Sequence, residues 1–211
     1  MFLRENYVMI FEEGYIYHIY NQGNNRQRVF FSKENYLYFL HKIRRHILPH
    51  CDILAYCIMP NHFHLMVLVN HLEIVITESG QFSEINDQRQ LRKRTLNQSI
   101  GIMLRSYTNA LNKQRNTSGS VFRKETKAEC VNCPEGLAPS FIMQNGTTVI
   151  DNREPEREYP QICFNYIHQN PVNANLVERM EDWEFSSARD YAGLRNGTLV
   201  AKEIAKKYFK F

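Results

Sequence analysis

The chain has 211 residues, of which 43% are hydrophobic and 23% are charged, with 12 tyrosines, 13 phenylalanines and a formal net charge of +4. This composition is typical of a globular protein with a sizeable core, and it excludes a disordered chain. No apolar run is long enough for a membrane span, and charged residues interrupt the amino terminus where a signal peptide needs an apolar core, so we expect a cytoplasmic protein that does not enter membranes.

The first 132 residues alternate between strand-like and helix-like patterns. Runs rich in β-branched and aromatic residues predict strands, and runs with apolar residues every three or four positions predict helices. The order β-α-β-β-α-β is that of the ferredoxin-like fold, an α+β class with an antiparallel sheet. In chain order we expect a strand at 15–20, a helix between Ser32 and Pro49, strands at 53–58 and 62–69, a helix at 92–114 and a strand at 127–131.

The remainder of the chain predicts an insertion and a helical end. Residues 133–160 are rich in proline and lack periodicity, so they predict an inserted loop after a core at 1–132. Residues 161–169 predict a helix that ends at Asn170-Pro171, because the residue before a proline is disfavoured in the helical conformation. Three shorter helices are expected in the rest of the carboxyl-terminal section, 161–211, at 175–182, 186–194 and 200–211.

Five cysteines at irregular spacing predict reduced, mostly buried thiols rather than a disulfide framework. Cys130 and Cys133 form one Cys-x-x-Cys pair. A structural zinc site needs four ligands, so this pair alone does not favour zinc.

Two histidines stand two residues apart at the start of the most strand-like run. Alternation along a strand places His62 and His64 on one face and Phe63 and Leu65 on the other. Two neutral imidazoles side by side can hold a divalent metal, and a metal beside a nucleophile supports phosphoryl transfer. We therefore treat His62 and His64 as candidate metal ligands.

Tyr107 lies in the apolar stripe of the predicted helix at 92–114. One interpretation makes it a core residue that packs on the sheet. The other applies if this helix, or a partner's copy of it, packs near the histidine face: the hydroxyl then attacks a metal-polarised phosphodiester and forms a covalent phosphotyrosine. The pattern leaves both interpretations open.

Basic residues are concentrated in two stretches that flank the histidine strand. Residues 89–127 contain ten lysines and arginines against one acid, and residues 23–46 contain six against one. Such stretches around a candidate metal site favour a polyanionic partner, and a single strand needs cations along its backbone. The candidate contacts are Arg26, Arg28, Arg44, Arg45, Arg92, Lys93, Arg94, Arg123 and Lys124.

Four stretches in the same order resemble the single-tyrosine transposases with a histidine-hydrophobic-histidine (HUH) motif, in particular the REP-associated branch. They are 17–30, 56–69, 106–122 and 166–191. The resemblance implies an HUH catalytic core that cuts and rejoins single-stranded DNA at hairpins with Mg²⁺ or Mn²⁺. It also implies that His62 and His64 bind the metal and that Tyr107 forms a 5′-phosphotyrosine link. A monomer whose tyrosine acts in its own active site is favoured, with a homodimer as the alternative.

The third metal ligand departs from the family pattern. Relatives supply an amide about one turn after the tyrosine, where this chain has Ala110 and Leu111. Asn112 is the nearest amide, but on a regular helix it points about 140° away from the tyrosine. Other residues considered for this place are Asn61 and His18.

Two other functions remain open. A nucleotide hydrolase with an alternating histidine strand needs a third histidine at position 66, where Met66 stands. A domesticated relative would keep the fold and bind nucleic acid without cutting it. Intact His62, His64 and Tyr107 favour the enzyme over this binding protein.

Overall fold

The computed structural model describes residues 9–76, 92–133, 141–144, 147–150 and 155–211. Their centre is a four-stranded sheet with the order β2-β3-β1-β6, in which every neighbouring pair is antiparallel. This order and the two helices that connect its strands confirm the expected α+β, ferredoxin-like architecture. The four strands are β1 (Ile16–Gln22), β2 (Cys51–Met59), β3 (His62–Val69) and β6 (Lys127–Cys130).

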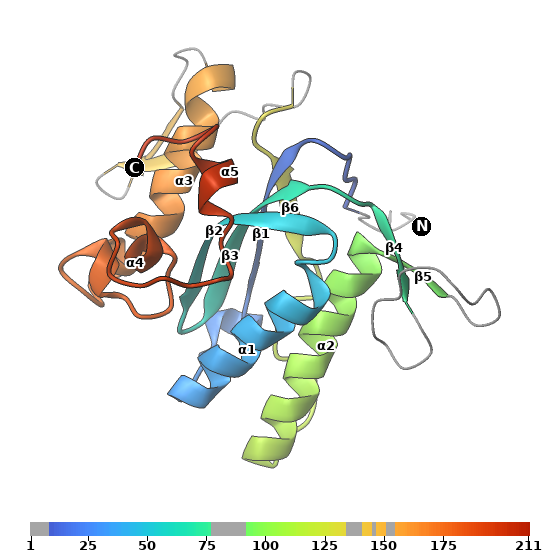
Figure 1. The fold of residues 1–211 in the computed structure, drawn as a ribbon. Helices are drawn as coiled ribbons and strands as arrows, with labels where there is room; N and C mark the ends of the chain where they lie inside the picture. The colour runs from blue at the N-terminus through green and yellow to red at the C-terminus, as the bar shows by residue number, and fades with distance from the viewer. Residues whose placement is uncertain (1–8, 77–91, 134–140, 145–146, 151–154) are drawn as a thin grey trace, which may run out of the picture.

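Two long helices lie side by side over one face of the sheet (Figure 1). Helix α1 (Lys33–His46) begins after Ser32, whose backbone N–H donates to Oδ1 of Asn35. Helix α2 (Leu96–Arg115) begins after Thr95, which forms a capping box with Gln98.

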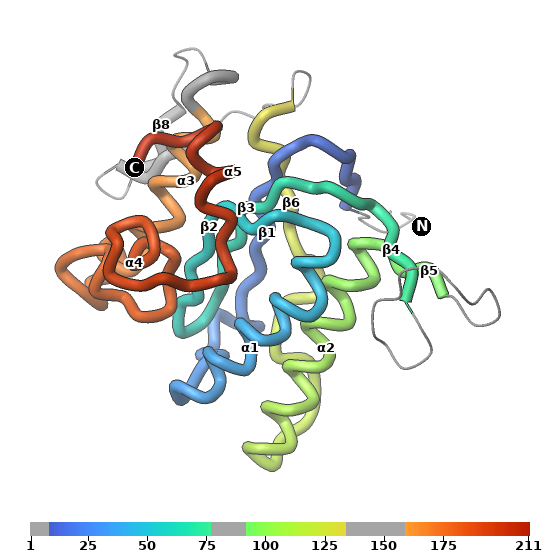
Figure 2. The backbone as a smooth tube through the Cα atoms, viewed as in Figure 1, coloured from blue at the N-terminus to red at the C-terminus, as the bar shows by residue number. Residues whose placement is uncertain are grey.

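The start of α2 differs from the expected residue 92. Residues Arg92–Thr95 form strand β5 instead, which pairs with β4 (Glu73–Ile76) in a separate ribbon. Figure 2 shows this ribbon on the side of the sheet away from the carboxyl-terminal section. The connection between β3 and α2 therefore contains two strands, and residues 77–91 between them lie outside the described residues.

The face under α1 and α2 is the apolar face of β3. Phe63 is fully buried, and its ring lies 5.0 Å from that of Phe39 on α1. Tyr107 on α2 is also buried here, with its ring 5.1 Å from Phe39, and its hydroxyl donates a hydrogen bond of 3.0 Å to the carbonyl of Val29. Tyr107 is thus a core residue with a satisfied hydroxyl.

The opposite face of the sheet is covered over β2 and β3 by a third helix, α3 (Pro155–Asn173). Phe164 and Ile167 of α3 are buried with Cys57 and Met66 of the sheet. Burying these side chains stabilises the docked helix by about 1.5–3 kcal/mol for each large apolar group.

Helix α3 continues past Asn170-Pro171, where the sequence pattern predicted its end. A proline lacks the N–H group that the helix uses, but Pro171 lies in the last turn. The residues after it still close their bonds, from the Ala174 N–H to the Asn170 carbonyl and from the Leu176 N–H to the Pro171 carbonyl. Tertiary packing therefore keeps Asn170 inside the helix.

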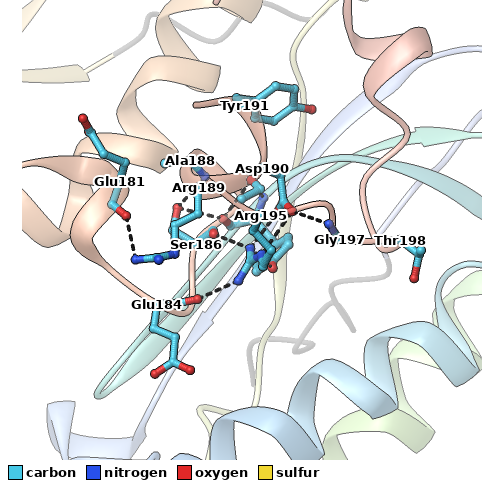
Figure 3. A network of polar contacts seen from close by, with 12 residues as sticks. Glu181, Glu184, Ser186, Ala188, Arg189, Asp190, Tyr191, Arg195, Gly197 and Thr198 are labelled. Carbon is cyan, nitrogen blue, oxygen red and sulfur yellow. Dashed lines mark hydrogen bonds and ion pairs between the residues drawn. The ribbon is translucent and has the colours of Figure 1, made fainter. Parts of the chain in front are cut away.

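The carboxyl-terminal section is attached to β2 by a buried polar network (Figure 3). Arg195 forms two hydrogen bonds with Asp190, which is 2% exposed, and it also donates to the Tyr56 hydroxyl of β2. A paired guanidinium and carboxylate with further hydrogen bonds is the arrangement that makes buried charges tolerable.

A second contact ties α3 to the same strand. Nε2 of His168 lies 2.7 Å from Oγ of Ser187, and this oxygen accepts a hydrogen bond of 2.8 Å from the Tyr56 backbone N–H. Helix α3, the carboxyl-terminal section and β2 are thus linked through one hydroxyl.

The segment expected to be a loop at 133–160 contains structure. Strands β7 (Phe141–Gln144) and β8 (Thr147–Ile150) pair as a hairpin, and α3 already begins at Pro155. The later helices are shorter than expected: η2 (Met180–Asp182), α4 (Ala188–Tyr191) and α5 (Lys202–Ala205).

Three cysteines match the expectation of buried thiols, namely Cys51, Cys57 and Cys163. Cys130 and Cys133 differ from it, since they form a disulfide. Within the described residues, no helix is both long and apolar enough to cross a membrane.

The Tyr107 hydroxyl provides a test of the packing on the helix face. We expect Tyr107→Phe to lower the free energy of unfolding by about 1–2 kcal/mol, because the buried Val29 carbonyl loses its donor. Urea unfolding followed by circular dichroism measures the change. An unchanged midpoint would mean that this hydrogen bond is not made in solution.

Candidate functional site

The histidines of β3 lie on the face that α3 covers. His64 is 5% exposed and His62 is partly exposed, and their ring centroids are 4.9 Å apart. Strand alternation and the apolar side chains of Phe63 and Leu65 on the other face explain this placement. The expected pair of imidazoles is therefore formed.

Each imidazole is held through its Nδ1 atom. Nδ1 of His62 lies 2.6 Å from Oδ1 of Asn61, and Nδ1 of His64 lies 2.8 Å from Nε2 of His18. Nε2 of His64 is buried and has no hydrogen-bond partner among the described residues. Burying a polar nitrogen without a hydrogen-bond partner costs free energy, and a bound ligand would remove this cost.

Helix α3 brings an amide and a phenol to the same place. Oδ1 of Asn170 lies 3.4 Å from Nε2 of His62, and the ring centroid of Tyr166 lies 5.5 Å from that of His64. Tyr166 and Asn170 are four residues apart and so share one face of the helix. Tyr166 is 46% exposed and lines a cavity that also reaches both histidines.

Burial keeps the site uncharged. It lowers the pKa values of His62 and His64 below the ordinary value of 6.5, and the nearby Asn170 amide opposes the shift in both. Burial also raises the pKa of Tyr166, while its interaction with Asn170 again acts in the opposite direction. Both imidazoles are therefore neutral at pH 7, the form that binds a metal.

The donor set fits a divalent cation. Among the described residues no three His, Cys, Asp or Glu side chains cluster as ligands, and the candidate donors are two imidazole nitrogens and the nearby amide oxygen of Asn170. Mg²⁺ prefers oxygen ligands throughout, whereas a mixed nitrogen and oxygen set is better suited to Mn²⁺. The remaining positions are left for water or substrate oxygens.

An open cavity of about 480 Å³ is lined by His62, His64 and Tyr166. Arg123 and Lys124 stand exposed on its rim, and Lys127 forms an ion pair of 3.2 Å with Glu125. Tyr20 closes one wall, and its hydroxyl donates to Glu129. A cavity lined by three cations, one carboxylate and two imidazoles has an excess of positive charge, which suits a phosphate-bearing ligand.

Tyr107 does not lie beside the histidines, which corrects the second interpretation of the sequence. Helix α2 packs on the Phe63 face, so the sheet itself separates Tyr107 from the cavity. Asn112 does not reach the site either, since its amide donates to the Gly119 carbonyl and accepts from Thr117 at the end of α2. Tyr107 and Asn112 instead have structural contacts.

Of the nine candidate cations, Arg123 and Lys124 line the cavity. Arg26 contacts the start of the histidine strand only through its backbone carbonyl, which accepts from the Asn61 amide. The guanidinium of Arg44 is bonded to Thr198, and that of Arg28 to the Phe30 carbonyl. The other four do not line this cavity: Arg45, on α1, and Arg92, Lys93 and Arg94, on β5.

Sequence reasoning missed Tyr166 and Asn170 as site residues. The signal was their spacing of one helical turn in the stretch Tyr-Ile-His-Gln-Asn-Pro. The proline rule ended the predicted helix at this asparagine and so removed the amide from the helical face.

No protein-family model matches the chain, and no curated protein matches its sequence. A structural match exists to a REP-associated tyrosine transposase bound to a REP hairpin. The match covers 89% of this chain and 86% of that one, with a TM-score of 0.52 and 15% sequence identity. The family resemblance noted in the sequence thus extends to the fold.

Asn170 tests the assignment of the donor set. We expect Asn170→Ala to weaken Mn²⁺ binding at least about 10-fold, because the candidate oxygen ligand beside the two imidazoles is lost. Isothermal titration calorimetry on the full chain measures this. Asn112→Ala is the matched control, and equal losses in the two variants would contradict the assignment.

Proposed function

We propose that this protein cleaves and rejoins single-stranded DNA, with Tyr166 as the nucleophile. The observation that carries the proposal is the convergence of four side chains from two elements: His62 and His64 of β3, and Tyr166 and Asn170 of α3. In relatives an amide follows the tyrosine by about one helical turn. Asn170 stands in this position after Tyr166, whereas no amide does so after Tyr107.

The reaction follows from the chemistry of a phenol. The Tyr166 oxygen attacks a backbone phosphorus, the new bond joins this oxygen to phosphorus, and the bond from phosphorus to O3′ breaks. The phenolic proton passes to water, and the departing O3′ takes up a proton. The covalent ester keeps the energy of the original bond, so a 3′-hydroxyl can later reverse the step and rejoin a strand.

The chain's own groups prepare this attack. Tyr166 stands at the cavity beside His64, which limits where the attacked phosphate can lie. A divalent ion held by His62, His64 and Asn170 would polarise the phosphate oxygens when bound. All four residues belong to one chain, which favours a tyrosine that acts in its own active site and a monomer as the active unit.

The shape of the surface favours an extended strand. Arg123 and Lys124 also line a second groove of about 800 Å³ along α2, where Asn97, Arg105 and Asn109 contribute polar groups. The segment around Arg123 therefore stands between two cavities. A flexible single strand can leave the catalytic cavity over these cations and follow the groove.

A structured DNA partner is part of the proposal. The matched transposase is described as bound to a REP hairpin, and this chain shares its fold. We therefore propose that a hairpin with a single-stranded flank is the substrate class, with the flank at the cavity.

The tyrosine assignment can be tested with two matched variants. The full chain is incubated with an end-labelled hairpin oligonucleotide and Mn²⁺, and covalent adducts are resolved on a denaturing gel. We expect an adduct with the wild type and with Tyr107→Phe, and none with Tyr166→Phe, because Tyr166 lines the cavity whereas Tyr107 is buried on the other face of the sheet.

An adduct that persists in Tyr166→Phe and disappears in Tyr107→Phe would overturn the assignment. Retention of the DNA with no adduct in any sample would instead favour a binding protein without cleavage.

The path of the strand can be tested through its charges. We expect the double variant Arg123→Ala, Lys124→Ala to bind single-stranded DNA more weakly. The slope of a plot of log K against the logarithm of the salt concentration should become less steep by about 0.7 for each lost phosphate contact. Fluorescence anisotropy between 50 and 200 mM salt, concentrations typical for such work, measures it. Arg45→Ala on α1 is the control, and an equal effect there would contradict this path.

A further inference from the structure

We propose that His18 of β1 is a positioning residue that holds His64 in the metal-binding tautomer. The inference rests on the proposed function, because it concerns the same metal site. It assigns a role to a side chain that touches neither the proposed substrate nor the ion.

The geometry places the two rings in direct contact. Nε2 of His18 lies 2.8 Å from Nδ1 of His64, and the ring centroids are 5.0 Å apart with an angle of 25° between the planes. The strands pair so that Tyr20 faces His64 and His18 faces Met66. The contact is therefore diagonal, between neighbouring strands of a rigid sheet.

A neutral imidazole carries one proton on two nitrogens, so the direction of this hydrogen bond decides the chemistry. If Nδ1 of His64 donates to His18, then Nε2 of His64 carries a lone pair at the cavity. If His18 donates instead, the proton of His64 moves to Nε2 and blocks a metal. Only in the first arrangement can the buried Nε2 of His64, which has no hydrogen-bond partner among the described residues, coordinate a metal.

The partner of His62 is an amide rather than an imidazole. Its Nδ1 faces Oδ1 of Asn61, and the amide nitrogen of Asn61 donates to the Arg26 carbonyl, which identifies the oxygen as the acceptor. An amide oxygen only accepts, so this contact sets the tautomer of His62 by itself. His64 depends on an imidazole that must carry its own proton on Nδ1.

Folding alone does not require an imidazole at position 18. His18 is 5% exposed, with the aromatic rings of Tyr20 and Tyr166 nearby, and a buried polar ring costs free energy unless it is hydrogen-bonded. A phenylalanine of similar shape satisfies the packing without this cost. We therefore attribute the imidazole at position 18 to its hydrogen bond with His64.

The test compares His18→Phe with His18→Gln in the full chain. The first variant removes the acceptor, and the second places an amide oxygen near the position of Nε2. We expect Mn²⁺ affinity, measured by calorimetry without DNA, to fall about 10- to 100-fold in His18→Phe and to recover in His18→Gln.

A second readout does not depend on the metal. Nitrogen-15 NMR of the histidine rings in the metal-free protein reports the tautomer of each imidazole. We expect His64 to carry its proton on Nδ1 in the wild type and to become a mixture in His18→Phe. The signals of His62 serve as the internal control, because Asn61 still holds that ring.

The outcomes separate this inference from the proposed function. If the wild type binds Mn²⁺ and His18→Phe changes neither its affinity nor the His64 tautomer, the positioning role is wrong and the metal site stands. If the tautomer changes as expected but the wild type binds no Mn²⁺, the proposed function fails and the positioning role stands. A His64 proton on Nε2 in the wild type overturns the inference.

Discussion

The docking of α3 across the histidine face of the sheet is the constraint on which the site depends. Phe164 and Ile167 supply the apolar contact, and the hydrogen bonds through Ser187 join His168 to β2. Without this helix neither Tyr166 nor Asn170 would lie beside the two histidines. The sheet supplies His62 and His64, and the carboxyl-terminal section supplies Tyr166 and Asn170. Arg195 and its partners attach this section to the sheet.

Charge is distributed so that the interior of the site is neutral and its rim is cationic. Burial favours neutral imidazoles, and the third candidate ligand is an amide rather than a carboxylate. A neutral donor set leaves the positive charge of a bound ion uncompensated, which strengthens its attraction for a phosphodiester. Arg123 and Lys124 at the rim act in the same direction over a longer distance.

Local patterns predicted much of this protein. The strand that holds His62 and His64 was placed with its observed bounds, because alternation along a strand is a property of neighbouring residues. The same holds for the start of the first helix at Ser32 and for the order of the sheet elements. Predictions that relied on a single local rule were weaker, as the proline at position 171 and the start of α2 show.

The sequence by itself determined the ferredoxin-like order, the paired imidazoles and the concentration of basic residues. The tertiary structure decided which tyrosine faces those imidazoles. Tyr107 and Tyr166 both lie on helices, and helical periodicity does not state which face of a sheet a helix will cover. That choice depends on contacts between residues far apart in the chain, such as Ile167 with Met66 and Phe39 with Tyr107, so it becomes visible only when the chain is folded.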